Sequence, residues 1–416
     1  MQTNLAAWIK DTPAGIEAEA ILRKCVHCGF CLATCPTYRL LGDELDSPRG
    51  RIYLMKQALE GAPVTERTQL HLDRCLTCRS CETTCPSGVQ YGRLVDIGRE
   101  LVEEKVPRAP LERFKRWALR RALLIRPLFA LGLGLGRLLR SVLPESLANQ
   151  VPERREAGAW PAARHARRML VLRGCVQPAI APSIDAAAAR VLDRLGISLL
   201  VAEGSGCCGA VSHHLGAPRE ALDFVRANIE AWWPHVEGGA EAIVMTASGC
   251  GAMVAEYGHL LRNDPAYAAK AERITALSKD LAEVLAAESE ALAKLVAPAS
   301  TPQKVAYHAP CSQQHGLKVR GTAESILRVA GLELTAVPDA HLCCGSAGTY
   351  SILQPELSRS LVRNKLRALM TGKPDVIATA NIGCLTHLES AAVRPVRHWI
   401  EVLETRIKGI NGDATL

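Results

Sequence analysis

In the second half of the chain, short apolar runs alternate with longer stretches in which apolar residues recur every three or four positions. Short apolar runs at 169–172 and 304–307 indicate buried strands, and each is followed by apolar positions three or four residues apart, which predict a helix. The same order then continues in both halves of this region. The predicted helices are 183–195, 218–233 and 277–285 in one half and 322–330, 355–369 and 396–403 in the other, and the further strands are 197–201, 242–246, 332–337 and 375–379. Strands alternating with helices predict two parallel α/β sheets.

The first hundred residues carry a different pattern. Thr12-Pro13 begins an apolar periodicity that ends before Cys25, and further periodic stretches cover 52–59 and 91–105. These stretches predict helices, so we expect the N-terminal part to be mostly helical. The fold class predicted for the whole chain is therefore a helical domain followed by two duplicated α/β domains.

Cysteine spacing defines the chemistry of the helical part. Two runs have the form C-x2-C-x2-C-x3-C-P, with cysteines at 25, 28, 31 and 35 and again at 75, 78, 81 and 85. This is the spacing by which bacterial ferredoxins hold cubane [4Fe–4S] clusters, whose iron prefers soft thiolate ligands. Two runs predict two clusters.

The assignment of ligands to each cluster follows from the position of the proline. In two-cluster ferredoxins the cysteine before proline ligates the other cluster. We therefore predict one cluster on Cys25, Cys28, Cys31 and Cys85, and a second on Cys75, Cys78, Cys81 and Cys35. Structural zinc is the alternative, since C-x2-C pairs also build zinc sites, but zinc does not require four cysteines at this spacing twice.

A second set of cysteines repeats at long period. Cys175, Cys207, Cys208 and Cys250 recur as Cys311, Cys343, Cys344 and Cys384, and glycine follows each adjacent pair. All lie near the predicted ends of strands, where parallel sheets gather their sites. They predict either a further iron–sulfur centre or a redox-active thiol pair, while a buried inert cysteine remains the alternative for any one of them.

Two other signals near these cysteines are weaker. Residues 204–209 satisfy G-x-G-x-x-G after a strand, but the second repeat lacks the first two glycines, which argues against a nucleotide site. His387 lies three residues after Cys384 and is a candidate ligand, although Met253 occupies its place in the first repeat. No catalytic triad or carboxylate dyad is found, so no catalytic residue is predicted.

Residues 114–144 are apolar and basic, with seven lysines and arginines among residues 115–140, and no acidic residue before Glu145. Their longest uncharged piece spans ten residues, and a membrane-spanning helix needs about twenty. The segment is either an amphipathic surface for a membrane or partner, or a helical linker packed on the chain itself. The predicted domains are 1–110, a basic linker at 111–166, and two cysteine-rich domains at 167–298 and 299–416.

The composition indicates the cellular compartment of the protein and the class of its partners. Sixteen cysteines arranged as ligand motifs, with no export signal in residues 1–10, predict a reducing compartment and a position on the cytoplasmic side. The formal charge of +8 is offset by thiolate-bound clusters, and 4% aromatic residues leave few stacking platforms. Nucleic acid is therefore not expected as a partner.

The twin ferredoxin motifs and twin Cys-Cys-Gly segments resemble the iron–sulfur family that includes subunits of glycolate oxidase, lactate-utilisation proteins, anaerobic glycerol-3-phosphate dehydrogenase and heterodisulfide reductase. The glycolate oxidase members resemble this chain from end to end, including Cys25-Val-His-Cys28-Gly-Phe-Cys31 and Ser47-Pro48-Arg49-Gly50. One departure is that Cys250 and Cys384 stand alone, whereas heterodisulfide reductase repeats end in C-x2-C. That departure argues against noncubane clusters.

The resemblance implies an electron relay in a hetero-oligomer. FAD-binding partner subunits would oxidise glycolate, and also D-lactate, with glyoxylate as the product from glycolate. This chain would pass the electrons toward a respiratory acceptor such as quinone at the inner membrane. Other relatives imply a lactate or glycerol-3-phosphate dehydrogenase instead. A third hypothesis is an enzyme in its own right that reduces a disulfide or quinone at the Cys-Cys-Gly segments.

Overall fold

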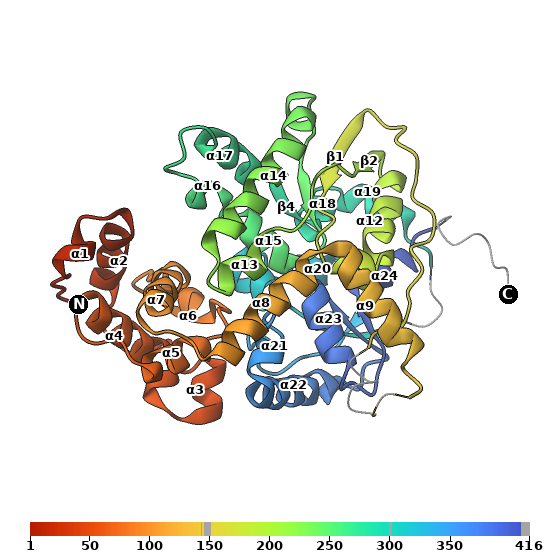
Figure 1. Ribbon diagram of the computed structural model, residues 1–416. Coiled ribbons are helices and arrows are strands. Elements are labelled where there is room, and N and C mark those ends of the chain that lie inside the picture. Colours follow the sequence, from red (N-terminus) through yellow and green to blue (C-terminus); the bar gives the residue numbers. More distant parts are fainter. Residues whose placement is uncertain (143, 145–150, 299–301, 409–416) are drawn as a thin grey trace. The chain divides into compact units, whose positions relative to one another are not determined.

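The computed structural model describes residues 1–142, 144, 151–298 and 302–408 (Figure 1). Residues 143 and 145–150, in the predicted linker, and 299–301 and 409–416, in the predicted second cysteine-rich domain, lie outside the described residues. Contacts divide the chain into two compact units. The first contains residues 1–117 and 341–365, and the second contains the described residues of 118–340 and 366–416.

The first unit is helical, as predicted. The helices that lie wholly within it are α1 (Ala7–Lys10), α2 (Pro13–Lys24), α3 (Pro36–Leu41), α4 (Pro48–Leu59), α5 (Glu66–Asp73), α6 (Ser80–Thr84), α7 (Tyr91–Lys105) and α21 (Tyr350–Leu353), with a 3-10 turn η1 at Glu44–Asp46. Parts of α8 (Pro110–Leu124) and α22 (Pro355–Leu369) also belong to it. Proline at the first position and a side-chain cap explain two of these starts: Thr12 accepts from Gly15 N at α2, and Ser47 accepts from Gly50 N at α4. A single apolar core joins α2, α4, α5 and α7.

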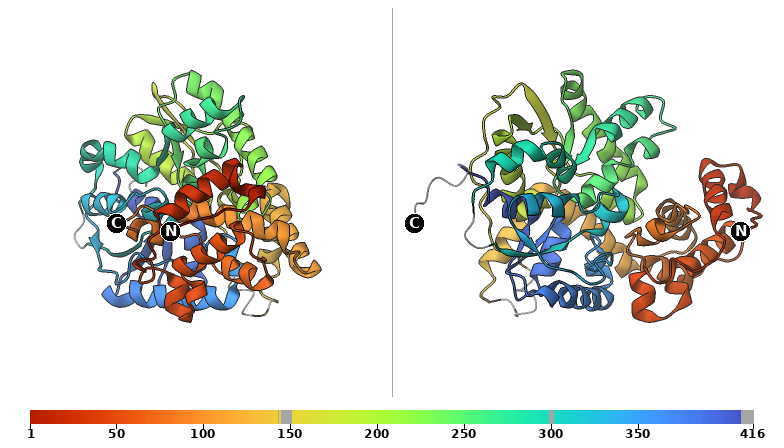
Figure 2. Two further views of the ribbon diagram at one scale, coloured as in Figure 1. Left: turned by 90° about the vertical axis from the view of Figure 1, so that its left-hand side faces the viewer. Right: turned by 180° about the vertical axis from the view of Figure 1, so that it is seen from behind.

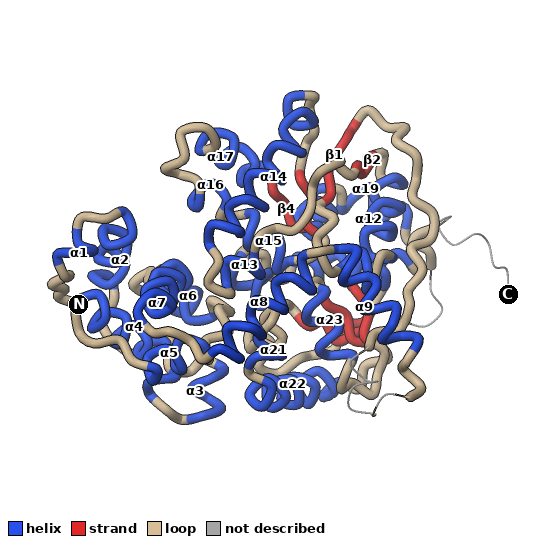
Figure 3. The backbone as a smooth tube through the Cα atoms, in the orientation of Figure 1, coloured by secondary structure: helices blue, strands red, loops and turns tan. Residues whose placement is uncertain are grey.

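The second unit holds all the strands among the described residues, drawn red in Figure 3. One sheet has the order β2-β1-β3-β4 and the other β6-β5-β7-β8, and every pairing is parallel. The strands are β1 (Arg167–Val171), β2 (Ile197–Leu200), β3 (Ile243–Met245), β4 (Ser278–Asp280), β5 (Lys304–His308), β6 (Glu333–Leu334), β7 (Val376–Thr379) and β8 (Val396–His398). The predicted pair of parallel α/β sheets is confirmed.

The closing segment of each repeat corrects one prediction. Residues 277–285 and 396–403 were predicted as helices throughout, but each contains an edge strand, β4 or β8, before its helix, α18 (Leu281–Ala287) or α24 (Trp399–Glu404). Three-residue strands are too short to show a period. The helices begin later because capping boxes fix their starts at Asp280 with Glu283 and at His398 with Glu401.

The two sheets belong to repeats that pack on each other reciprocally (Figure 2). Helix α12 (Ser183–Arg194) contacts α24 of the other repeat, and α20 (Thr322–Val329) contacts α18. The ends of β4 and β8 also form hydrogen bonds to the other repeat. Gln313 Nε2 donates to Asp280 Oδ1 at 3.0 Å, and His398 Nε2 lies 2.9 Å from the carbonyl oxygen of Thr246. The duplication seen in the cysteine spacing is therefore also a duplication of the interface.

The basic apolar segment is helical. It forms the C-terminal part of α8 (Pro110–Leu124) and all of α9 (Arg126–Leu138), and neither helix has a buried residue. No helix in the part of the chain that the structure describes is both long and apolar enough to cross a membrane. Helical structure agrees with both alternatives for this segment, the packed linker and the amphipathic surface.

The glycine of each Cys-Cys-Gly sequence is required for steric reasons. Gly209 and Gly345 both have φ near +91°, and a Cβ at either position would lie 2.9 Å from a carbonyl oxygen, that of Ala221 or of Ser358. In both loops the glycine N–H also donates to the sulfur of the first cysteine of the pair, at 3.3 Å in Cys207 and 3.4 Å in Cys343. The glycine thus lets the turn close around the cysteine pair.

We expect Gly209→Ala to lower the free energy of unfolding by about 2–4 kcal/mol. The alanine would have to adopt a left-handed backbone conformation, and its Cβ would clash with the carbonyl oxygen of Ala221. The matched control is Gly196→Ala. Gly196 has φ +80°, and a Cβ added there would meet nothing within 4 Å, so only the backbone cost of about 1–2 kcal/mol applies. Thermal unfolding of the two variants and the parent checks the difference, and equal losses would contradict the steric account.

Candidate iron–sulfur sites

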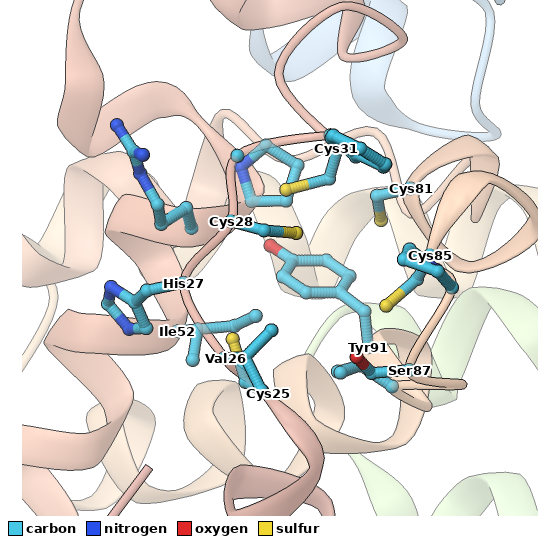
Figure 4. Close-up of a pocket in the computed structure, with 16 residues that line it drawn as sticks. Cys25, Val26, His27, Cys28, Cys31, Ile52, Cys81, Cys85, Ser87 and Tyr91 are labelled. Atoms are coloured by element: carbon cyan, nitrogen blue, oxygen red, sulfur yellow. The ribbon is translucent and has the colours of Figure 1, made fainter.

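The first ferredoxin motif forms a loop between α2 and α3. Its turns require positive φ at His27 (54°) and Gly29 (83°). Cys25, Cys28 and Cys31 line a cavity that is also lined by Cys81 and Cys85, both from the second motif (Figure 4). The space between these residues is about 440 Å³ and includes open solvent, and Cys28 is exposed.

The second motif repeats this loop between α5 and α6. Thr77 and Arg79, at the positions equivalent to His27 and Gly29, also have positive φ, 50° and 57°. Cys81 is buried, and the thiols of Cys78, Cys75 and Cys35 interact with it electrostatically. Cys35 interacts electrostatically with both Cys31 of its own motif and Cys81 of the other motif, and Cys25 interacts with Cys85. These neighbours are compatible with the predicted crossed ligand sets, and the ligand assignment itself stays a prediction.

The thiols of the two sets differ in their electrostatic surroundings. Burial raises the pKa of Cys31 to about 11 and that of Cys81 well above its ordinary value, and neighbouring thiolates add to both effects. Burial acts in the same direction on Cys75, yet the positive charges of Arg51 and then Arg99 lower the pKa of Cys75. A thiolate at Cys75 is thus stabilised before any metal binds.

A buried ionic network beside Cys35 and Cys75 was missed from the sequence. The Arg51 side chain is 1% exposed and that of Asp46 is fully buried, and Arg51 Nη2 lies 3.1 Å from Asp46 Oδ1. Arg51 Nε also donates to the carbonyl oxygen of His71 at 2.6 Å, and Arg74 Nη1 approaches Asp46 Oδ2 to 2.8 Å. Arg51 was visible in the sequence only as part of a helix start, with no sign that its side chain turns inward.

Two hydrogen bonds further organise Cys75. Thr77 N donates to its sulfur at 3.4 Å, and the buried Tyr91 hydroxyl donates at 3.6 Å. Arg99 holds the same turn by donating to the carbonyl oxygens of Leu72 and Cys75 and to Thr77 Oγ1. These contacts fix the position of Cys75 independently of a bound cluster.

The first repeat brings its four predicted cysteines together. Cys175 neighbours Cys207, and Cys208 neighbours both Cys207 and Cys250. The thiol groups thus form a continuous row at the ends of parallel strands, as predicted. Such a row can hold a metal centre or exchange a disulfide.

Two buried side chains shape the loop that carries Cys207 and Cys208. Asn228 Oδ1 accepts from Gly206 N at 2.7 Å, and Asn228 Nδ2 donates to the carbonyl oxygen of Cys207 at 2.8 Å. The Tyr257 hydroxyl donates to the carbonyl oxygen of Cys208 at 2.9 Å. Arg126 of α9 donates to the backbone carbonyls of Arg173 and Ser205 beside this loop, which places a positive charge at its rim.

The cysteines of the second repeat fall into both compact units. Cys311 and Cys384 belong to the second unit, where the His308 ring lies within 4.8 Å of Cys384 Sγ. His308 was not predicted as a ligand, and the role proposed for His387 stays a prediction. Cys343 and Cys344 are buried in the first unit, where Tyr350 interacts electrostatically with both Cys343 and Cys75.

The donor chemistry of the first unit fits iron–sulfur clusters. All eight motif cysteines lie in one helical unit, and two cysteines of the second motif, Cys81 and Cys85, line the cavity of the first loop. Soft thiolates at this spacing are the ligands that such clusters take. Clusters held there would supply one-electron transfer. The protein's part is to supply the thiolates, the hydrogen bonds to them and the charge around them.

Comparison with known proteins agrees with this organisation. Residues 21–89 match the 4Fe-4S dicluster domain model, and residues 169–255 and 305–389 each match the Cysteine-rich domain model. The chain is 54% identical over 409 residues to the glycolate oxidase iron-sulfur subunit of Escherichia coli (strain K12), covering 98% of this chain and all of that protein.

More distant relatives extend the comparison. A probable glycolate oxidase iron-sulfur subunit of Bacillus subtilis is 30% identical over 401 residues, which is 89% of each chain. Lactate utilization protein A of Bacillus licheniformis is 30% identical over 238 residues, 56% of this chain and 97% of that one. With two ferredoxin-type cysteine motifs in a helical unit and two parallel sheets that carry Cys-Cys-Gly sequences, the chain belongs to the glycolate oxidase iron-sulfur subunit family, whose members are iron–sulfur electron-transfer proteins.

Proposed function

We propose that this chain relays electrons inside a glycolate dehydrogenase complex, from an FAD-binding partner subunit toward the respiratory chain. The observation that carries the proposal is the position of both ferredoxin-type motifs in one compact unit, where Cys81 and Cys85 of the second motif line the cavity of the first loop. Two adjacent clusters form a path for single electrons. The name of the 54% identical relative supports glycolate as the substrate of the complex.

The redox balance explains why a flavin partner is needed. Oxidation of glycolate to glyoxylate removes two electrons and two protons, which a flavin can take together. The reduced flavin then returns to FAD by releasing two protons and passing two electrons singly. The eight ligand cysteines of this chain hold centres suited to that second step.

The substrate rests on the relatives and not on a pocket of this chain. The lactate utilization relatives, which cover little more than half of the chain, keep D-lactate or another 2-hydroxy acid as the alternative. If the complex were instead a glycerol-3-phosphate dehydrogenase, only the partner subunit would differ, and this chain would keep the same role. The partner subunit would select the substrate in each case.

A second candidate function concerns the first Cys-Cys-Gly repeat. The row formed by Cys175, Cys207, Cys208 and Cys250 supports an additional iron–sulfur centre that would lengthen the electron path. The same row supports disulfide or quinone reduction at this repeat. Iron content of a variant lacking Cys207 and Cys208 separates a metal centre from a thiol pair.

Attachment to the inner membrane on its cytoplasmic side is part of the proposal, with quinone as the acceptor. On α9 a leucine face remains exposed, formed by Leu128 (48%), Leu131 (62%), Leu135 (51%) and Leu138 (77%). Arg126 and Arg137 donate to backbone carbonyls, which do not neutralise their charges. An apolar face bordered by arginines suits the surface of an anionic bilayer.

Loss of one ligand should stop the relay. We expect Cys28→Ser to abolish glycolate-dependent reduction of a quinone analogue by the reconstituted complex, while the flavin subunit still reduces an artificial dye. Glu104→Ser, an exposed change on α7, is the control and should keep full activity. The isolated chain should turn over neither glycolate nor lactate. Turnover by the isolated chain would contradict the relay and favour a reductase.

The α9 leucine face should govern membrane binding. We expect the double variant Leu131→Asp and Leu138→Asp to lower the fraction of protein that sediments with phosphatidylglycerol vesicles by at least tenfold. The reason is that each leucine side chain would contribute about 1.5–3 kcal/mol on moving from water into the bilayer. Val393→Asp, at a position 87% exposed outside the segment, is the control. Equal sedimentation of the variant and the parent would reject the membrane role.

A further inference from the structure

We propose that Arg51 raises the reduction potential of the second cluster site above that of the first, so that electrons collect at the site of Cys35, Cys75, Cys78 and Cys81. This inference rests on the proposed function, because it assumes that both cysteine sets hold clusters. It assigns a tuning role to a residue that ligates nothing. It also gives the relay a direction.

Arg51 is placed between two ligands of the second set. Its guanidinium interacts electrostatically with both Cys75 and Cys35. Arg51 Nη1 donates to Thr37 Oγ1 at 3.2 Å, and Thr37 Oγ1 lies 3.3 Å from Cys35 Sγ. Because the Arg51 side chain is only 1% exposed, water does little to screen its charge from these sulfurs.

The charges around this site do not cancel. Arg51 and Arg74 share the single carboxylate of Asp46, and Arg99 adds a third positive charge, since it donates to the Leu72 and Cys75 carbonyls and to Thr77 Oγ1. Reduction adds a negative charge to a cluster. Positive charge held in a poorly hydrated interior therefore favours the reduced form and raises the potential.

The first site has arginines of a different kind. Arg49 is paired with Glu44, and its side chain is 32% exposed. Arg23, two residues before Cys25, is 65% exposed and paired with Glu19. The arginine charges are neutralised by neighbours and screened by solvent, and Cys28 itself is exposed. The N-terminal ammonium also lies near this site and donates to the carbonyl oxygen of Cys25 at 2.7 Å. It is a single charge, whereas Arg51, Arg74 and Arg99 surround the second site. We therefore assign the lower potential to the first site.

The proposed difference in reduction potential agrees with the surroundings of the two cluster sites. Val26 (67% exposed) and Phe30 (62%) surround the exposed Cys28, so a donor can approach the first site closely. The second site adjoins Tyr350, whose hydroxyl donates to the carbonyl oxygen of Arg74 at 3.2 Å and which also interacts with Cys343. The site at which electrons collect thus lies beside the second Cys-Cys-Gly loop of the same compact unit.

The test is a potentiometric titration of the full-length holoprotein, followed by EPR. The parent should show two one-electron midpoints, and Cys78→Ser should perturb the signal with the higher one. In Arg51→Gln we expect the higher midpoint to fall by about 59 mV or more, which is a tenfold change in the ratio of reduced to oxidised clusters at fixed potential. Arg51→Lys should retain most of the potential.

The matched control is Arg23→Gln, which removes an arginine near the first site but an exposed one, and should leave both midpoints unchanged. If Arg51→Gln does not fold, Arg99→Gln should lower the same midpoint by a smaller amount. Unchanged midpoints in the Arg51 or Arg99 variant, or a fall in the lower midpoint alone, would overturn the inference. A parent protein without two EPR-active clusters would instead reject the proposed function.

Discussion

The close approach of two short cysteine loops is the constraint on which the first unit depends. Cys81 and Cys85 of the second motif line the cavity of the first loop, and Cys35 of the first motif interacts with Cys81. In the crossed assignment that we predict, neither loop completes its set of four sulfurs alone. Helix α3 begins directly after Cys35, and α6 contains Cys81 and ends before Cys85. Helices α4 and α7 pack against each other in the core of the unit. Folding of the unit therefore brings the two loops together.

Much of this could be predicted from local sequence. The cysteine spacing, the prolines at helix starts and the Cys-Cys-Gly repeat each have a local cause, and the two parallel sheets followed from the alternation of short and long apolar patterns. The edge strands β4 and β8 were missed because three residues carry no period, although the capping boxes at Asp280 and His398 marked where their helices begin. The domain boundaries predicted from composition remain predictions.

Arg51 and Asp46 show what a local pattern cannot give. A charged side chain on an amphipathic helix is ordinarily expected at the surface, and only the fold reveals that this pair is buried between α4, η1 and α5 against two ligand cysteines. His308 and Tyr350 were missed for the same reason, since their neighbours are distant in sequence. The residues that adjust a site are less predictable than those that form it, because their role depends on burial.

The central claim is the crossed grouping of the cysteines, and EPR of single-ligand variants tests it most directly. Reduced holoprotein carrying Cys85→Ser should lose or alter the same cluster signal as Cys28→Ser, and Cys35→Ser should alter the same signal as Cys78→Ser. Each variant should leave the other signal in place, apart from a change in the magnetic coupling between the two centres. If Cys85→Ser instead alters the signal that Cys78→Ser alters, each motif holds its own cluster and the account of an interleaved pair is wrong.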